Sequence, residues 1–325
     1  MAYDAPRMLR RRKLLTSLPA VALIPSSVSA QQMKATLGTT SSGGGGFAIY
    51  SAALLDTLRS ADPVFDLRAV ATKGSSDNAA LLKAGEIDFG MVTGEVAHEL
   101  MADGDGKGSG VKIVSVMYSA PGLFAVLADS RYHTIDDLKG RRIVWNARET
   151  GVAVQARYVM EGLGLDMDKD FEPLYPEKFT EGPTLIMDGK AAALWGTGMR
   201  WPGFVEMANS PRGARFVAPS LAEIKRIRTK YPFMAELIVP GGMYRGQYDP
   251  ITTIGTWTFI LARPGLNDAV GRRMASALRK AERTGALNNN LLAQTTAKNT
   301  LSAIPGVDAL QPGVAQYFRD QGLLK

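Results

Sequence analysis

The sequence has no cysteine and only two histidines, His98 and His133. Without cysteine there is no thiol nucleophile, no cysteine-ligated zinc site and no iron–sulfur cluster. The two histidines are 35 positions apart and neither belongs to an HExxH pattern, which argues against a histidine-based metal centre. These absences favour a binding protein over a metalloenzyme, and we expect neither a metal nor a cofactor.

The sequence also lacks a basic stripe interleaved with aromatic residues, which a nucleic-acid backbone would require. The formal net charge is +7, but the first thirty residues alone contribute +4 of it through five basic residues and one acid. The remaining +3 is a mild surplus spread over nearly three hundred residues. We therefore expect no nucleic-acid partner.

No apolar run reaches the roughly 20 residues that a membrane-spanning helix needs. The N-terminus instead has basic residues, an eleven-residue apolar run over 14–24, and the small residues Val28, Ser29 and Ala30. This order is typical of an export signal, so residues 1–30 are predicted to be a signal peptide cleaved after Ala30. The prediction implies a periplasmic protein. The segment 11–15 (RRKLL) also resembles a twin-arginine motif, and the choice between that route and the general secretory route stays open.

What the chain does contain is a regular alternation of short apolar runs and amphipathic stretches. Residues 35–93 predict a strand-helix-strand-helix-strand order, and residues 142–195 repeat that order without repeating the sequence. Short connections between such elements imply parallel sheets flanked by helices. The fold class is therefore α/β with two lobes, each a mostly parallel sheet with helices on its faces.

Two extended segments would carry the chain between the lobes. Residues 111–118 and 123–128 are predicted to be separate strands divided by the turn 119–122, and residues 251–263 one long strand. A two-strand hinge is expected over 117–128 and 251–262. Lobe one would then hold residues 31–122 and 255–325, and lobe two residues 123–254.

Candidate ligand-binding residues follow the predicted strands of lobe one. Parallel strands present a ligand site beyond their carboxyl ends. The first strand leads into a glycine-rich loop before a helix, and free N–H groups at such a helix start favour an anion. A flexible turn is the alternative for the glycines, and helix capping is the alternative for the serines of the next loop. The candidates in lobe one are Ser41, Gly44, Gly45, Phe47, Gly74, Ser75, Ser76, Asn78 and Thr93.

Lobe two offers a matching set of candidates: Arg148, Thr150, Trp195 and Trp201. An arginine can pair bidentately with a carboxylate, so Arg148 is expected to balance the ligand's charge. A salt bridge with a surface acid such as Glu149 is its alternative role. The two tryptophans lie in or beside a glycine-rich segment and are predicted to form a wall of the cleft.

Several motifs taken together resemble the TAXI family, the extracytoplasmic substrate receptors of TRAP transporters. They are the strand and glycine-rich loop over 37–47, GSSDN over 74–78, LLKAGEID over 81–88 and PGGMYRGQ over 240–247. The resemblance covers essentially the whole chain after the signal peptide. It implies a type II periplasmic-binding-protein fold that closes on a small carboxylate, often an amino acid, and delivers it to integral-membrane TRAP subunits.

Two positions depart from the family pattern. Phe47-Ala48 stands where many members have a Tyr-Tyr pair, and residues 148–151 (RETG) replace a small glycine-serine loop. Both changes fall on positions expected to face the ligand, so they put glutamate as the ligand in doubt.

No catalytic set is evident in the sequence: a GxSxG elbow and kinase and metal motifs are all missing. We therefore expect a monomeric receptor that is not an enzyme. A sensor component with a signalling partner and a hydrolase or transferase on the same scaffold remain as alternatives.

Overall fold

The computed structural model describes residues 1–3, 32–40, 46–102, 109–148, 150–288 and 292–325. The chain divides into two units, Met1–Gln31 and Gln32–Lys325, and every helix and strand among the described residues belongs to the second. The predicted signal peptide and its cleavage site lie outside the described residues, apart from the first three. Within the described ranges, no helix combines the length and the apolar character needed to cross a membrane.

The first part of the chain folds as the alternation predicts. Strand β1 (Met33–Gly38) pairs in parallel with β2 (Phe65–Val70) and β3 (Phe89–Thr93), with Met33 opposite Phe65 at the start of the register. The helices between and after these strands are α1 (Gly46–Ala61), α2 (Ser75–Ala84) and α3 (Gly94–Met101).

The second alternating segment builds another parallel set. Strand β5 (Arg142–Val144) pairs with β6 (Glu172–Leu174) and β7 (Ala193–Thr197). The elements that accompany them, in chain order, are a 3-10 turn (Asp136–Leu138), α4 (Gly151–Leu163), α5 (Glu181–Met187), α6 (Pro202–Asn209), β8 (Ala214–Val217), α7 (Leu221–Lys230) and β9 (Ala235–Val239).

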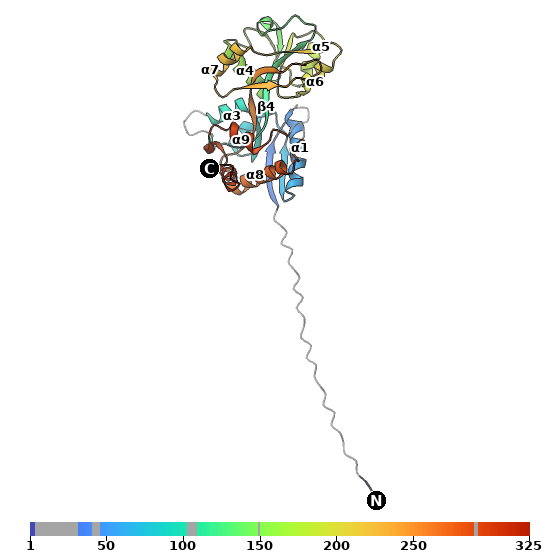
Figure 1. The fold of residues 1–325 in the computed structure, drawn as a ribbon, viewed down its shortest axis with the longest axis vertical. Coiled ribbons are helices and arrows are strands. Elements are labelled where there is room, and N and C mark those ends of the chain that lie inside the picture. Colours follow the sequence, from blue (N-terminus) through green and yellow to red (C-terminus); the bar gives the residue numbers. More distant parts are fainter. Residues whose placement is uncertain (4–31, 41–45, 103–108, 149, 289–291) are drawn as a thin grey trace. The chain divides into compact units, whose positions relative to one another are not determined.

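Two long antiparallel strands join the two sets. Strand β10 (Ile251–Ala262) pairs with β3, β4 and β9, and β4 (Lys112–Leu127) pairs with β10, β7 and β8. The sheet order is β2-β1-β3-β10-β4-β7-β5-β6, so it is mixed, with parallel strands toward each end. In Figure 1, β4 runs between the half that contains α1, α3, α8 and α9 and the half that contains α4, α5, α6 and α7.

The prediction of two strands over 111–128 was wrong, because β4 is continuous through Pro121. Proline lacks the N–H that a central strand would normally donate. Here it lies at the point where the pairing of β4 passes from β10 to β7: Pro121 is opposite Gly255, and Gly122 is opposite Thr197. A residue without a donor is tolerated at such a change of partner.

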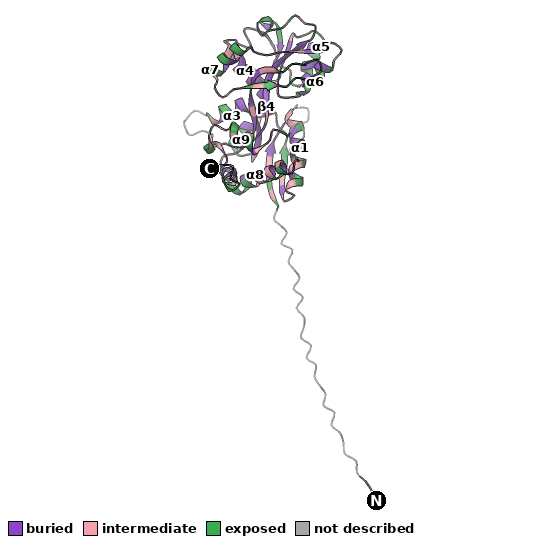
Figure 2. Cartoon of the chain, viewed as in Figure 1, coloured by how far each residue is buried: buried purple, intermediate pink, exposed green. Residues whose placement is uncertain are grey.

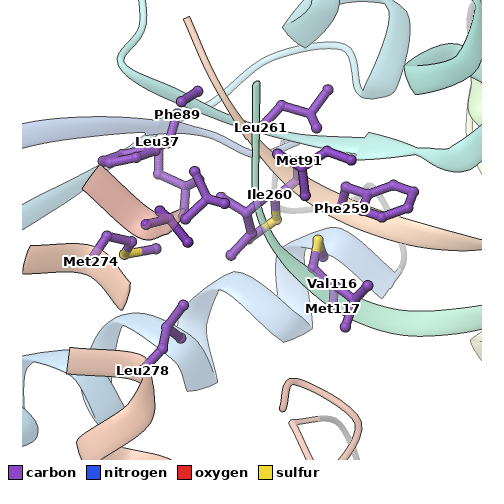
Figure 3. Close-up of a cluster of buried hydrophobic side chains, with 14 of the residues drawn as sticks. Leu37, Phe89, Met91, Val116, Met117, Phe259, Ile260, Leu261, Met274 and Leu278 are labelled. Atoms are coloured by element: carbon purple, nitrogen blue, oxygen red, sulfur yellow. The ribbon is translucent and has the colours of Figure 1, made fainter. Parts of the chain in front are cut away.

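Buried apolar side chains form separate cores in the two halves. One cluster draws on residues 35–117 and 259–318, and Figure 3 shows Leu37, Phe89, Ile260, Met274 and Leu278 converging in it. Two further clusters lie entirely within residues 123–254. The buried positions follow the strands and the inner faces of the helices, while the outer helix faces are exposed (Figure 2).

The C-terminal segment returns to the first half, as its red colour in Figure 1 shows. It contains α8 (Asp268–Arg283), α9 (Ala297–Ala303), a 3-10 turn (Val307–Ala309) and α10 (Pro312–Asp320). Pro312 occupies the first turn of α10, where the absent proline N–H removes no helical hydrogen bond. Segments from both ends of this unit therefore share one core.

Candidate functional site

A cavity of about 390 Å³ is lined by residues of both halves. This is within the usual size of small-molecule sites. The first half and the β4–β10 pair contribute Thr40, Gly46, Phe47, Ile49, Lys73, Gly74, Ser75, Thr93, Tyr118, Ala120, Thr258, Ala293 and Gln294. The second half contributes Thr150, Gly151, Val152, Phe179, Thr197, Gly198, Met199, Arg200, Trp201, Pro202, Pro240 and Met243.

Four helices begin at this cavity. The lining includes the first residues of α1 (Gly46, Phe47), α2 (Ser75), α4 (Gly151) and α6 (Pro202). The start of a helix carries partial positive charge and N–H groups without intrahelical partners. Four such starts around one space favour an anionic ligand.

The start of α2 depends on Gly74, whose φ of 121° and ψ of −152° lie in a region open essentially to glycine alone. The Gly74 N–H donates to Thr72 Oγ1 at 3.1 Å. The next residue links two strand ends, because Thr93 N–H donates to Ser75 Oγ at 2.8 Å. The loop is therefore held by its own hydrogen bonds beside the cavity.

Six of the thirteen candidate residues line the cavity. These are Phe47, Gly74, Ser75, Thr93, Thr150 and Trp201. Two of them also have structural roles. Thr150 caps α4 by accepting a hydrogen bond from Ala153 N–H at 3.3 Å, and Ser75 accepts the hydrogen bond from Thr93 N–H described above. Ser41, Gly44 and Gly45 lie outside the described residues.

Arg148 is not part of this cavity. Its guanidinium pairs with Asp168 at 3.0 Å and lies over the Tyr175 ring, 3.7 Å from the ring centroid, in a separate surface pocket. The Arg148 hydrogen bond, together with one from the Tyr175 hydroxyl, lowers the pKa of Asp168. The alternative role, a salt bridge to a surface acid, describes its observed contacts, with Asp168 as the acid.

Three other candidates also lie away from the cavity wall. Asn78 is fully buried, and its Nδ2 donates to Gly38 O, Thr39 O and Met91 O, so it joins strand ends. Ser76 is on α2 but is not among the lining residues. Trp195 is inside β7 with its ring packed edge-on against Phe124, 4.8 Å away, in one second-half core, whereas Trp201 belongs to another.

The sequence reasoning missed seven polar lining residues: Thr40, Lys73, Tyr118, Thr197, Arg200, Thr258 and Gln294. Lys73 and Arg200 follow strands of different halves, in segments that the sequence reasoning did consider, so their charge was an available signal. Arg200 has φ of 52°, which is uncommon for a residue with a side chain. Tyr118 and Gln294 come from β4 and the C-terminal segment, and no local motif marks them.

The electrostatics of the cavity wall are one-sided. Lys73 and Arg200 are exposed, and neither has a carboxylate partner among the described residues. No described lining residue is an aspartate or glutamate. Within the described part of the chain, no group of three or more histidine, aspartate or glutamate side chains could hold a metal ion.

A second contact between the halves, which we call the α3–α4 contact, is held by paired polar groups. Gln155 Nε2 donates to Glu95 Oε1 at 2.7 Å, and Thr256 Oγ1 donates to the same oxygen at 2.8 Å. Arg157 pairs with Glu99 at 2.6 Å. Burial raises the pKa of Glu95, whose Oε2 has no partner among the described residues.

The sequence matches the NMT1-like family over residues 37–322. The chain belongs to the NMT1-like family. This NMT1-like protein is similar in structure to a protein assigned as an L-cystine ABC transporter from Listeria monocytogenes, with 15% identity and a TM-score of 0.50 over 82% of this chain and 99% of that one. It is also similar to the alkanesulfonate-binding protein SsuA from Xanthomonas axonopodis pv. citri, with 17% identity and a TM-score of 0.45 over 91% and 94% of the two chains.

The likeness to the Listeria structure concerns the fold. It agrees with the mixed sheet and flanking helices described above and confirms the predicted α/β fold of the type II periplasmic-binding-protein class. In this NMT1-like protein, the cavity lies where that fold brings the starts of helices from both halves together.

Proposed function

We propose that this NMT1-like protein is an extracytoplasmic receptor of a TRAP-type transporter, of the TAXI kind, that captures a small organic carboxylate. One observation carries the proposal: the cavity is lined by residues of both halves. The described lining includes two cationic side chains, Lys73 and Arg200, and no aspartate or glutamate. A carboxylate there meets Lys73 from one half and Arg200 from the other. Contacts to both halves give the ligand a higher affinity for a closed arrangement, which is what shifts a population toward closure.

The two halves act as lobes in this proposal, with residues 31–122 and 255–325 in one and 123–254 in the other. Separate hydrophobic cores support this division, since each half can stay packed while the joint bends. The two crossings, 117–128 in β4 and 251–262 in β10, are the hinge. The receptor is proposed to be a monomer in the periplasm, exported by its first thirty residues.

An uptake assay tests the role. Cells stripped of periplasmic contents regain uptake of the bound carboxylate when the purified protein is added back, and collapse of the ion gradient abolishes that uptake. Uptake that survives gradient collapse but is blocked by vanadate would instead indicate an ATP-driven partner. Binding without any restored uptake would favour the sensor alternative, and conversion of the bound compound would favour the enzyme.

A further inference from the structure

The charge of the cavity wall indicates whether the ligand carries an amino group beside its carboxylate. A free amino acid carries an ammonium group next to its carboxylate, and burying that cation requires a nearby anion or several good acceptors. The described wall has the opposite charge: its ionised side chains, Lys73 and Arg200, are both positive. An ammonium group in the same space would be repelled by them.

The neutral acceptors in the wall are mostly engaged within the protein. Gln294 Oε1 accepts from Ser119 N–H at 2.7 Å and from Ser119 Oγ at 3.2 Å. Thr150 Oγ1 donates to Ala147 O at 2.7 Å and also caps α4. Thr258 Oγ1 donates to Tyr118 O at 2.8 Å and accepts from Tyr118 N–H at 3.2 Å. Among the lining hydroxyls, those of Thr40, Thr197 and Tyr118 have no hydrogen-bond partner among the described residues, so few side-chain oxygens remain for an ammonium group.

Of these three, the Tyr118 hydroxyl belongs to the long strand β4 that joins the two halves. Burial and the nearby Tyr50 raise the pKa of Tyr118, which keeps the phenol protonated and able to donate. A hydroxyl donor suits a carboxylate, carbonyl or hydroxyl oxygen on the ligand. The polar part of the wall therefore offers donors and cations.

The remainder of the wall is largely apolar. Phe47, Ile49, Val152, Phe179, Trp201 and Met243 line it from both halves. Ile49 is 49% exposed, although it is a large apolar side chain on α1. A ligand with a hydrocarbon or aromatic body would cover such side chains and gain from removing them from water.

Building on the proposed function, we propose that the ligand is an organic carboxylate with an apolar body and no ammonium group, such as a 2-oxo acid, a 2-hydroxy acid or an unsubstituted aryl or alkyl acid. Its carboxylate meets Lys73 and Arg200, and its oxygen substituent faces donors such as Tyr118. Amino acids of the same shape should bind more weakly, because the ionised side chains of the described wall are positive.

Matched pairs that differ only in the substituent at carbon 2 test this assignment by calorimetry: phenylpyruvate and phenylalanine, 4-methyl-2-oxopentanoate and leucine, 2-oxoglutarate and glutamate. In the apolar pairs the oxo acid should bind at least about 30-fold more tightly, which corresponds to about 2 kcal/mol. Equal or tighter binding of the amino acids would overturn the assignment and leave the carboxylate-receptor proposal standing. Failure of all six acids and of phenylacetate to bind would count against both.

A designed change in the wall gives a second readout. Met199→Glu places a carboxylate on the lining, and Met199→Gln is the neutral control of the same length. The ratio of the affinity for the oxo acid to that for the matching amino acid should be about tenfold lower in Met199→Glu than in Met199→Gln. The reason is that the new carboxylate can pair with the ammonium group of the amino acid. An unchanged preference in a folded Met199→Glu protein would contradict the charge argument. Amino-acid binding that Glu149→Gln abolishes would overturn it too and point to Glu149 as the acceptor.

Discussion

The cavity and the α3–α4 contact both draw residues from the two halves, but they treat charge in opposite ways. At the α3–α4 contact, Arg157 forms an ion pair with Glu99, and the buried Glu95 accepts hydrogen bonds from Gln155 and Thr256. At the cavity, Lys73 and Arg200 lack carboxylate partners among the described residues. Paired groups hold two surfaces together, whereas unpaired cations beside four helix starts remain available to an anion. The comparison distinguishes the side chains that hold the halves together from those that are available to bind a ligand.

The largest loss of ligand affinity is expected when one of the unpaired cations is removed. Arg200→Ala should weaken carboxylate binding by about 30-fold, or about 2 kcal/mol, because the ligand loses a cation in a closed cavity. Calorimetry with the carboxylate that binds the unmodified protein measures this. Arg212→Ala is a suitable control, since Arg212 is a second-half arginine paired with Asp129 at 2.7 Å. Equal affinities of the Arg200 and Arg212 variants would mean that unpaired charge does not mark the ligand site.

A smaller effect is expected where the halves touch beside the cavity. A Cβ at Gly151 would overlap the side chain of Thr93, so this glycine permits the close approach of α4 to the end of β3. Gly151→Ala should therefore hold the halves apart and reduce affinity by about tenfold, or about 1.4 kcal/mol. Small-angle scattering at saturating ligand should show a larger radius of gyration than for the unmodified protein.

The matched control for that variant is Gly140→Ala, at a glycine where a Cβ would meet nothing within 4 Å. Its φ of 66° adds backbone strain of its own, so the control also reports any loss of stability unrelated to the joint. Unchanged affinity and scattering in Gly151→Ala would mean that closure does not bring α4 against β3.

At the α3–α4 contact the prediction concerns stability. Because burial raises the pKa of Glu95, the folded protein keeps a proton there that the unfolded chain releases above about pH 4.5. The resulting stability is complete below pH 4.5 and is lost as pH rises toward the folded pKa. Glu95→Gln does not titrate, so it carries no such loss, and its melting temperature should exceed that of the parent by about 2 °C at pH 8.

Thermal unfolding measured from pH 4 to pH 8 checks this. The difference between Glu95→Gln and the parent should shrink toward zero at pH 4. Arg157→Ala, which removes a half-exposed ion pair from the same contact, should not melt above the parent at any pH in that range. A constant difference at every pH would show that Glu95 does not carry the proton.

The alternation of apolar runs was enough to predict the α/β fold, because helices and strands have different backbone periods and burying one face makes each period visible in the sequence. It also led to strand-end loops that do line the cavity, through Gly74, Ser75, Thr93 and Thr150. It missed α6, because the Pro-Gly of residues 202–203 indicates a turn, yet proline is equally suited to the first turn of a helix. The continuity of β4 depends on a change of pairing partner at Pro121, and strand pairing between distant segments cannot be predicted from the local sequence.

Side-chain direction was the other limit. Trp195 and Trp201 are six positions apart, but Trp195 is inside a strand and packs into one core, while Trp201 follows the strand and reaches the cavity. The same limit applies to two arginines of the second half, Arg148 and Arg200. Arg148 and Arg200 both follow strands, and only the fold places an acid and an aromatic ring beside the first.

The smallest effect is therefore expected at Arg148. Its side chain is 57% exposed in an ion pair with Asp168, and it lies over Tyr175 in a pocket separate from the cavity. Arg148→Ala should change carboxylate affinity by less than about threefold, or about 0.7 kcal/mol, since exposed pairs contribute little and this one does not face the ligand. Calorimetry alongside Arg200→Ala gives the contrast directly. If Arg148→Ala lost as much affinity as Arg200→Ala, the cation expected from the sequence would be the one that binds, and Arg148 would have to leave Asp168 when ligand is present. The single variant Asp168→Asn then separates the two cases. It keeps Arg148, so a direct contact between Arg148 and the ligand would survive, whereas an effect transmitted through the ion pair would be lost as it is in Arg148→Ala.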